Sequence, residues 1–348
     1  MEIDRVRQQY PYVVQVFKSS AFPPELVKGL SVALDDLGQS PLIVRSSSLL
    51  EDRTGSSFSG KYKSLFLANT GTKQERLSAL QDAVAEVYAS IFGPDPIEYR
   101  AERGLLEVHE EMGVMIQEVV GARIGKYFLP TFSGVAFSAN EFRWSPRIKR
   151  EDGLVRLVPG LGTRAVDRLS DDYPILFTPG QPGLRVNTTT DEIVRYSPKM
   201  IDLIDLETGT FGTVPVQEFL KEHGNSLPLI RRVVSIVEDD GIRRPTGLSL
   251  DFNEKETAVT FEGLVTETPF VKKMATLLEV LSSQLGTPVD IEFASNGEDF
   301  YLLQCRPQSY SLGGGPAHIP QDLPEKSVLY SANPIVSNGR VPDITHIV

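Results

Sequence analysis

The sequence is short of several residue types and patterns, and each shortage excludes a class of protein. It contains a single cysteine, Cys305, among 348 residues, which excludes an internal disulfide and fits a reducing compartment such as the cytoplasm. No apolar run approaches the roughly 18 residues of a membrane-spanning helix, and the N-terminus lacks the apolar stretch of a secretory signal. We therefore expect a cytoplasmic protein with no membrane partner.

Positive charge is also scarce. The chain has 35 lysines and arginines against 46 acidic residues, which gives a net charge of −11. A field of this sign disfavours nucleic acids and anionic membranes as main partners. An anionic ligand would have to be met by a local cluster of basic side chains and a metal ion. With 41% hydrophobic residues, the chain can bury a large core and is expected to form two lobes.

Polar side chains gather on a predicted β-hairpin late in the sequence, around the Asn-Gly turn at 296–297. A plain two-residue turn would leave Glu292 and Gln304 on opposite faces. A shift of one residue, by a three-residue loop or a bulge, places Asp290, Glu292, Gln304 and Arg306 on one face. The other face would then carry Ile291, Phe293, Tyr301, Leu303 and Cys305. Acid and amide oxygens beside an arginine suit magnesium and phosphate, although a solvated strand face is the commoner meaning of such a pattern.

A second polar stretch follows an apolar run, residues 41–44, that predicts a buried strand. It opens with Arg45 and is rich in serine and glycine as far as Gly60. Small residues let the backbone approach a polyphosphate, and their N–H and hydroxyl groups can bind its oxygens. Arg45 would add a permanent positive charge. By composition alone, an ordinary surface loop is the favoured interpretation of this stretch.

Taken in order, these segments resemble the N-terminal nucleotide-binding domain of the phosphoenolpyruvate synthase and pyruvate phosphate dikinase family. The resemblance covers about residues 40–310 and implies an α/β (α+β) ATP-grasp fold, whose two lobes with mixed sheets hold ATP and magnesium between them. The motifs that carry it are Val44-Arg45-Ser46-Ser47, Glu51-Asp52, Ser57-Phe58-Ser59-Gly60, Tyr99-Arg100 with Gly104, residues 114–120, residues 133–138, Gly160-Leu161-Gly162, Asp290-Ile291-Glu292 and residues 303–307.

The resemblance also implies roles for individual residues by their positions in these motifs. Glu292 and Gln304 would bind magnesium, with Asp290 supporting the site. Arg45 and Arg306 would contact phosphate as catalytic residues. The remaining nucleotide contacts implied are Ser46, Ser47, Ser59, Gly60, Gln117, Glu118, Val120, Gly160 and Gly162, of which Gln117, Glu118 and Val120 would line the adenine pocket.

In that family, ATP phosphorylates a histidine on a separate swivelling domain, which passes the phosphate to pyruvate. The expected function here is the Mg·ATP-binding part of such a phosphotransferase, with a phosphohistidine domain in the same longer polypeptide or in trans as its partner. The sequence departs from the family pattern because it has no upstream Gly-Gly-Lys-Gly segment, Thr163 replaces a glutamate, and no histidine stands in a Thr-Ser-His or Thr-Cys-His motif. We therefore expect the isolated chain to be inactive. Two alternatives stay open: a degenerate regulatory module, or a domain that serves another acceptor such as an antibiotic or a glucan.

The chain divides into three predicted segments. Residues 1–38 form a helical segment, and residues 39–310 form the nucleotide-binding domain, with its lobes at 39–112 and 113–310. The Gly-rich stretch and the apolar last residues predict that 311–348 is a linker and the start of a further domain.

Three local patterns complete the predictions. Apolar spacing over residues 73–104 predicts helices interrupted at Gly93-Pro94. Residues 248–252 and 258–261 read as a strand pair. The charged segment that begins at Arg164 predicts a phosphate-facing lid, favoured by its position, or a cluster of ion pairs.

Overall fold

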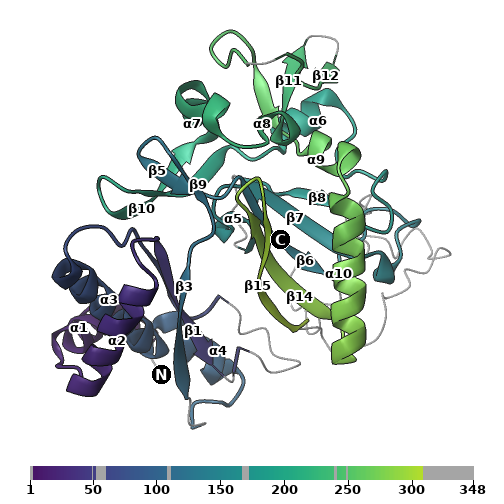
Figure 1. Cartoon of the computed structure of the whole chain (residues 1–348). Coiled ribbons are helices and arrows are strands. Elements are labelled where there is room, and N and C mark those ends of the chain that lie inside the picture. Colours follow the sequence, from purple (N-terminus) through teal and green to yellow (C-terminus); the bar gives the residue numbers. More distant parts are fainter. Residues whose placement is uncertain are drawn as a thin grey trace.

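The computed structural model of the chain describes residues 3–48, 50–51, 60–107, 111–166, 172–238, 241–247 and 250–308. Figure 1 shows a smaller, helix-rich lobe formed by the N-terminal part of the chain and a larger lobe formed by the rest. The predicted α/β class is confirmed. The paired strands are antiparallel rather than mixed, apart from an isolated parallel bridge between Gly160 and Asp202. Hairpins and short connections join many neighbouring strands, and such connections give antiparallel pairs.

The smaller lobe packs helices against the three-stranded sheet β2-β1-β3. The predicted break at Gly93-Pro94 is observed, because a proline begins α4 at that point. Thr72 caps α3 through its side chain, with Glu75 completing a capping box. The elements are α1 (Ile3–Ser19), α2 (Pro24–Asp36), β1 (Leu42–Ser48), β2 (Ser64–Leu67), α3 (Lys73–Ala89), η1 (Ser90–Phe92), α4 (Pro94–Glu102) and β3 (Met112–Glu118).

Among the residues described, the larger lobe contains three sheets, ordered β10-β9-β5-β4, β12-β11-β13 and β15-β14-β6-β7-β8. Its strands are β4 (Ala122–Ile124), β5 (Tyr127–Leu129), β6 (Phe132–Phe137), β7 (Leu154–Pro159), β8 (Ile175–Phe177), β9 (Met200–Asp205), β10 (Thr210–Pro215), β11 (Val234–Glu238), β12 (Gly241–Arg243), β13 (Thr257–Val259), β14 (Val289–Ser295) and β15 (Phe300–Pro307). Its helices are η2 (Arg150–Asp152), α5 (Thr163–Val166), α6 (Thr190–Arg195), α7 (Val216–His223), η3 (Gly224–Ser226), α8 (Ile230–Val233), α9 (Glu262–Glu267) and α10 (Phe270–Leu285).

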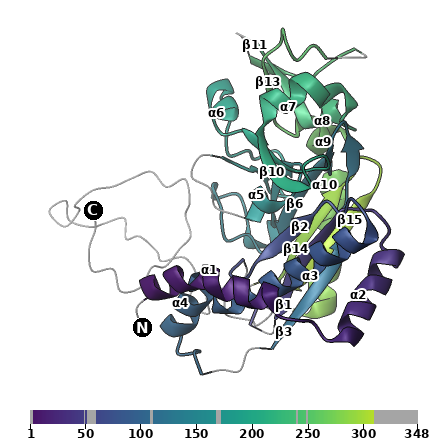
Figure 2. The same cartoon turned by 90° about the vertical axis from the view of Figure 1, so that its left-hand side faces the viewer.

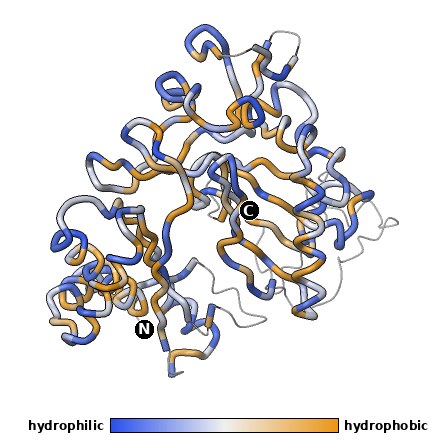
Figure 3. Tube along the Cα trace, in the orientation of Figure 1, coloured by the Kyte–Doolittle hydropathy of each residue, from blue (hydrophilic) through white to orange (hydrophobic). Residues whose placement is uncertain are grey.

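Apolar side chains fill one main core in each lobe. In the smaller lobe Leu34 and Leu80 from helices meet Leu42 and Val44 from β1. The larger core is rich in aromatic rings, and Phe270 of α10 contacts Phe132 edge to face at 5.6 Å. Figure 3 shows hydrophobic residues concentrated along the strands of both lobes. Among the helices that the structure describes, none has both the length and the hydropathy to cross a membrane.

The predicted strand at 248–252 is wrong for the residues described there. Leu250 and Phe252 are buried but lie outside any strand, and β13 pairs with β11 instead. The side chain of Asn225 donates to the carbonyl of Leu250 and accepts from its N–H. These bonds satisfy the backbone of Leu250 without a strand partner.

The lobes meet through a small apolar junction. Val119 at the end of β3 packs in one buried cluster with Leu161 and Ile204, and Phe66 of the smaller lobe joins it. Phe66 also stacks on Phe211 of β10, with ring centroids 5.4 Å apart. Figure 2 shows β1 and β3 beside the β14–β15 hairpin. This junction places the polar face of the hairpin opposite the sheet of the smaller lobe.

Candidate functional site

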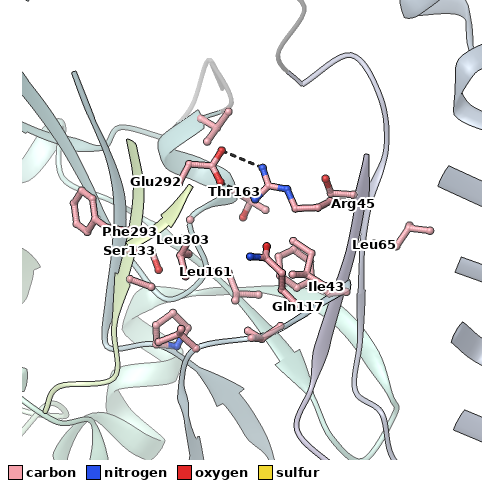
Figure 4. Close-up of a pocket in the computed structure, with 18 of the residues that line it drawn as sticks. Ile43, Arg45, Leu65, Gln117, Ser133, Leu161, Thr163, Glu292, Phe293 and Leu303 are labelled. Carbon is pink, nitrogen blue, oxygen red and sulfur yellow. Dashed lines mark hydrogen bonds and ion pairs between the residues drawn. The ribbon is translucent and has the colours of Figure 1, made fainter. Parts of the chain in front are cut away.

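A cavity of about 480 Å³ lies between the lobes. Strands β1, β2 and β3 form one side, while β6, β14, β15 and the turn before α5 form the other. Figure 4 shows Arg45 and Glu292 reaching toward each other across this cavity, with Ile43, Gln117 and Leu161 beside them. The residues that line it come from positions more than two hundred apart in the sequence, so folding assembles this site from both lobes.

The β14–β15 hairpin has the register shift that the polar pattern predicts. Glu292 lies opposite Gln304 and Asp290 opposite Arg306, so the four polar side chains share one face. The next pair is Phe293 with Leu302, which leaves Leu303 unpaired as a bulge. The predicted shared face is therefore confirmed.

The bulge lies within β15 rather than at the turn, and this changes two apolar positions. Tyr301 pairs with Ala294 and so falls on the face of Glu292, while the unpaired Leu303 lines the cavity. The prediction that Tyr301 belongs to the opposite face is therefore wrong, and Leu303, as the bulged residue, has no partner that assigns it to either face. The cause is the turn itself, where Asn296 Oδ1 accepts hydrogen bonds from the N–H groups of residues 298 and 299 and closes a four-residue loop.

Arg45 of β1 joins the lobes through this polar face. Its Nη1 donates to Glu292 Oε2 at 2.8 Å and its Nη2 to Glu292 Oε1 at 3.3 Å. The same Nη2 donates to Gln304 Oε1 at 2.9 Å. Burial works against the charge of Arg45, but the hydrogen bond and negative charge of Glu292 outweigh it and raise the pKa of the guanidinium. Thus the oxygens of Glu292 and Gln304 already hold a cation.

A second ion pair lies beside the first on the hairpin face. Arg306 Nε donates to Asp290 Oδ2 at 3.2 Å, and both side chains are largely buried. Burial raises the pKa of the Asp290 carboxyl, and the positive charge of Arg306 counteracts that rise. Neither residue lines the cavity directly, so their place in the structure is a supporting position next to Glu292 and Gln304.

Glu51 is a further, half-buried acid near both arginines. Burial raises the pKa of its carboxyl, while hydrogen bonds from Ser46 and the backbone of Ser48 and the charges of Arg306 and Arg45 work in the opposite direction. One carboxyl oxygen, Oε2, is buried and has no hydrogen-bond partner in the described part of the chain. The Glu51-Asp52 motif gave no indication that the carboxyl of Glu51 is affected by the charges of both arginines.

The structure places the other sequence-predicted contacts unevenly. Gly60, Gln117, Glu118, Val120 and Gly162 line the cavity together with Arg45 and Glu292. Ser59 lies outside the described residues.

Three predicted contacts lie near the cavity but do not line it. Ser46 is half-buried and bonds Glu51, and Ser47 is exposed on β1. Gly160 has a φ of +70°, and a Cβ there would meet the carbonyl oxygen of Asp202 at 2.4 Å. Gly160 thus shapes the turn that carries Leu161 and Gly162 into the cavity, because only glycine tolerates this conformation and approach.

In the described sheet, β3 is an edge strand, and its end presents backbone groups to the cavity. Val119 N–H donates to Pro41 O at 2.8 Å, so the polar backbone groups of Val119 point toward β1. Groups of successive strand residues alternate in direction, so those of Glu118 and Val120 point away from β1. Since β3 is an edge strand in the described sheet, these groups are placed to bind a ligand with a donor and an acceptor on one edge.

Sequence reasoning did not identify several residues that line the cavity. Ile43 precedes Arg45 by two residues on β1, and the two-residue period of a strand could have placed it beside Arg45. Leu161 stood in the Gly160-Leu161-Gly162 motif but was assigned no role. Phe66 carried no comparable signal, because it reaches the cavity through the junction of the lobes. Lys63 also lines the cavity and pairs with Glu86 at 2.9 Å.

The segment that begins at Arg164 was predicted to form a phosphate-facing lid. The described part of this segment does not show one. Arg164 Nη1 donates to Asp172 Oδ2 at 2.7 Å, and its Nε donates to Asp202 Oδ1 at 2.9 Å. Both acids are almost completely buried, so Arg164 belongs to an internal ion-pair cluster. Residues 167–171 lie outside the described part of the chain.

Two kinds of known protein resemble this chain in sequence. The family model described as "Pyruvate phosphate dikinase, AMP/ATP-binding domain" matches residues 1–327. A curated relative, a rifampicin phosphotransferase from Streptomyces sp, is 23% identical over 305 residues. That alignment covers 87% of this chain and 28% of the relative, so the chain corresponds to a fraction of that longer protein.

Proposed function

The chain belongs to the pyruvate phosphate dikinase AMP/ATP-binding domain family, and we propose that its inter-lobe cavity binds ATP with magnesium for phosphoryl transfer. ATP binding follows from the family. The finer assignments of metal, residue roles and phosphate acceptor are ours.

One observation carries the proposal: the guanidinium of Arg45 is held by the oxygens of Glu292 and Gln304. Magnesium prefers carboxylate and other oxygen ligands and keeps several waters. In the described residues there is no group of three or more His, Cys, Asp or Glu that could hold a metal alone. The donors present therefore fit an ion that shares its remaining positions with water and phosphate. Bound there, magnesium would neutralise charge on the phosphates.

Arg45 has a second role in this proposal. Its planar fork matches phosphate oxygens as well as carboxylate, so ATP can draw it away from Glu292 and Gln304. That exchange would release both oxygens for magnesium. Arg306 pairs with Asp290 next to these oxygens and does not line the cavity, so it would contact the phosphate chain only by leaving Asp290, as Arg45 would leave Glu292. Lys63 at the cavity wall adds a positive charge. Within the described lining, Arg45 and Lys63 are the basic residues.

The other end of the cavity suits adenine. The free carbonyl of Glu118 can accept from the amino group of adenine, and the N–H of Val120 can donate to the adjacent ring nitrogen. Ile43, Phe66 and Leu161 supply apolar walls for the ring. We assign Gln117 and Gly162, which also line the cavity, to contacts with the nucleotide.

For the acceptor, we propose a histidine on a separate swivelling domain, in the same longer polypeptide or in trans, from which phosphate passes to pyruvate. The description of the family names pyruvate and phosphate, which supports pyruvate as the final acceptor. We place the reaction in the cytoplasm. The name of the Streptomyces relative supports a second candidate, an antibiotic as final acceptor. Separating the candidates requires the acceptor: phosphoenolpyruvate formation favours the first, and phosphorylated rifampicin the second.

Calorimetric titration with ATP and magnesium tests nucleotide binding directly, with GTP as the comparison. Ligand at one hundred times its Kd should stabilise the fold by about 2.7 kcal/mol, which a thermal-shift assay can detect. Absence of heat and of a thermal shift with either nucleotide would contradict the proposal and favour a degenerate regulatory module.

The metal assignment has its own test in a matched pair of acids on the hairpin. Glu292→Gln should weaken magnesium-dependent ATP binding at least tenfold, because it removes the carboxylate charge from the cation site. Glu298→Gln makes the same change at the exposed turn and should leave binding unchanged. Equal effects of the two substitutions would show that the hairpin face does not hold the metal.

A further inference from the structure

A second cavity lies within the larger lobe and has a volume of about 790 Å³. It is formed by β8, the segment 185–187, α6, β11, β12 and the start of α9, and Figure 1 shows α6, β12 and α9 above β8. The two cavities share no lining residue. Strand β8 is three places from β14 in the sheet, or about 14 Å at roughly 4.8 Å per strand. A ligand here is therefore separate from the phosphate end of the ATP site.

The walls of this second cavity are apolar and aromatic. Tyr173 and Tyr196 meet edge to face, with ring centroids 5.1 Å apart. Ile175, Ile193 and Ile242 line the cavity and are only half-buried in the absence of a ligand. Covering these surfaces with a flat apolar ring system would remove them from water, which is the usual source of affinity in small-molecule sites.

Charged side chains of both signs line the same cavity: Arg185, Arg243 and Arg244 with Glu192 and Glu262. Arg243 and Arg244 pair with Glu238 and Glu267, which do not line it. Arg185 is the least exposed, at 23% of its side chain, and it pairs with Glu262 at 2.6 Å. Partly exposed ion pairs contribute about 1 kcal/mol or less, so the carboxylate of a ligand can replace Glu262 at little cost.

The cavity wall also contains a buried pair of hydroxyls. Ser235 Oγ and Thr260 Oγ1 are 2.6 Å apart, and their residues are 1% and 8% exposed. The pair can share only one hydrogen, and Thr260 Oγ1 already accepts from the N–H of Glu262. Whichever hydroxyl donates, the hydrogen of the other has no acceptor among the described residues. A buried donor without an acceptor is costly, so this pair provides a bond for an oxygen of a ligand.

We propose that this cavity binds an organic acid with a flat apolar body. The ligand's carboxylate pairs with Arg185 in place of Glu262. Its ring system packs against Tyr173 and Tyr196, and an oxygen of the ligand accepts the free hydrogen of the Ser235 and Thr260 pair. The site is additional to the proposed binding of ATP and does not depend on it.

Two probes of matched shape test the proposal: 2-naphthoate, which carries the acid, and 2-naphthamide, which is neutral. Calorimetry or ligand-observed NMR with the full chain should show the acid binding at least tenfold more tightly than the amide. Arg185→Gln should weaken binding of the acid at least tenfold. Glu262→Gln should strengthen it, because the competing carboxylate is gone. Lys272→Gln removes an exposed charge on α10, outside this cavity, and should change nothing.

Arg185→Gln should weaken binding of the acid and Glu262→Gln should strengthen it. Because a folding defect cannot strengthen binding, the test stays decisive even if one variant folds poorly. Equal affinity for acid and amide would overturn the proposed anion site, and so would binding that Glu262→Gln leaves unchanged. Absence of binding at millimolar probe would overturn it as well. ATP titrations with the same variants separate this site from the first cavity. Normal ATP binding by Arg185→Gln, with lost naphthoate binding, supports the proposal whether or not ATP is turned over.

Discussion

Two arginines of this chain, Arg45 and Arg164, are each held by two oxygen-bearing side chains. The two sites differ in how many further hydrogen bonds those oxygens accept. Around Arg164, the Asp202 carboxylate also accepts from Thr163 and Thr213, and Asp172 accepts from the backbone N–H of Lys199. Around Arg45, the carboxylate of Glu292 has hydrogen bonds to Arg45 alone among the described contacts.

The difference shows how one kind of ion pair can serve either structure or binding. A buried network in which every oxygen is satisfied is rigid, and breaking it exposes several groups at once. A pair at the wall of a cavity, with few other bonds, can exchange one partner for a ligand. We therefore expect substitutions in the Arg164 cluster to change stability and substitutions at Arg45 to change binding.

The largest expected effect is on stability, from Asp202→Asn. The carboxylate lies in a residue that is 4% exposed, and removing its charge leaves Arg164 with a single acid. Loss of one partner from a buried ion pair costs about 3–5 kcal/mol. We expect a decrease of that size in the free energy of unfolding, measured by urea titration.

A surface ion pair provides the control for this measurement. Asp35 pairs with Lys73 at 2.6 Å, but about half of each side chain is exposed. Asp35→Asn should therefore change the free energy of unfolding by about 1 kcal/mol or less. Similar losses for both variants would mean that the Arg164 cluster is no more structural than the surface pair.

The second largest effect concerns Arg45, whose replacement should weaken the binding of ATP and strengthen the binding of a metal ion. Arg45→Ala should weaken ATP binding by roughly 10- to 100-fold, since a hydrogen bond to a charged group contributes about 1.5–3 kcal/mol. In the absence of nucleotide, the same variant should bind manganese more tightly than the parent chain, because Glu292 and Gln304 lose the cation that occupies them. Electron paramagnetic resonance of free and bound manganese measures the second change.

Arg5→Ala, at an exposed position on α1, is the matched control and should change neither affinity. A loss of ATP binding without any gain of manganese binding would contradict the proposal that Glu292 and Gln304 bind either Arg45 or the metal. In that case Arg45 would contact phosphate only.

The polar face of the hairpin was predictable because a strand has a strict two-residue period. Only one register places Glu292 and Gln304 together, so the register shift followed from the residues. The location of the bulge at Leu303 did not follow, because it depends on the Asn296 side chain closing a four-residue loop. Predicting it requires knowing which of several turn geometries this segment adopts.

The Arg164 cluster and the second cavity were beyond sequence reasoning for another reason. Asp202 lies 38 residues from Arg164, and neither position belongs to a local pattern that would pair them. The residues around the second cavity likewise come from separate strands and helices. Local periodicity predicts which face of an element is buried, but packing decides which faces meet.

The smallest effect that we predict is a pH dependence of stability at Glu51, the half-buried acid near Arg45. Burial raises the pKa of its carboxyl in the folded chain, so the protonated form is favoured there. The parent chain is then most stable, with respect to this group, below the unfolded pKa near roughly 4.3. It loses that contribution as the pH rises through the folded pKa. Glu51→Gln cannot ionise, so its melting temperature relative to the parent should increase as the pH is raised from 4 to 8.

An exposed acid whose pKa is lowered rather than raised provides the control for this prediction, because its replacement should change stability in the opposite direction with pH. Hydrogen bonds from the backbone and side chain of Thr72 lower the pKa of Glu75, which stabilises the fold above the unfolded pKa and is lost as the pH falls. Glu75→Gln should therefore become less stable relative to the parent as the pH rises, whereas Glu51→Gln should become more stable. Differential scanning fluorimetry across the pH series would show the two differences diverging from a common origin at low pH. If the melting temperatures of Glu51→Gln and the parent change in parallel with pH, the carboxyl of Glu51 titrates as it does in the unfolded chain. In that case its ionisation does not destabilise the fold.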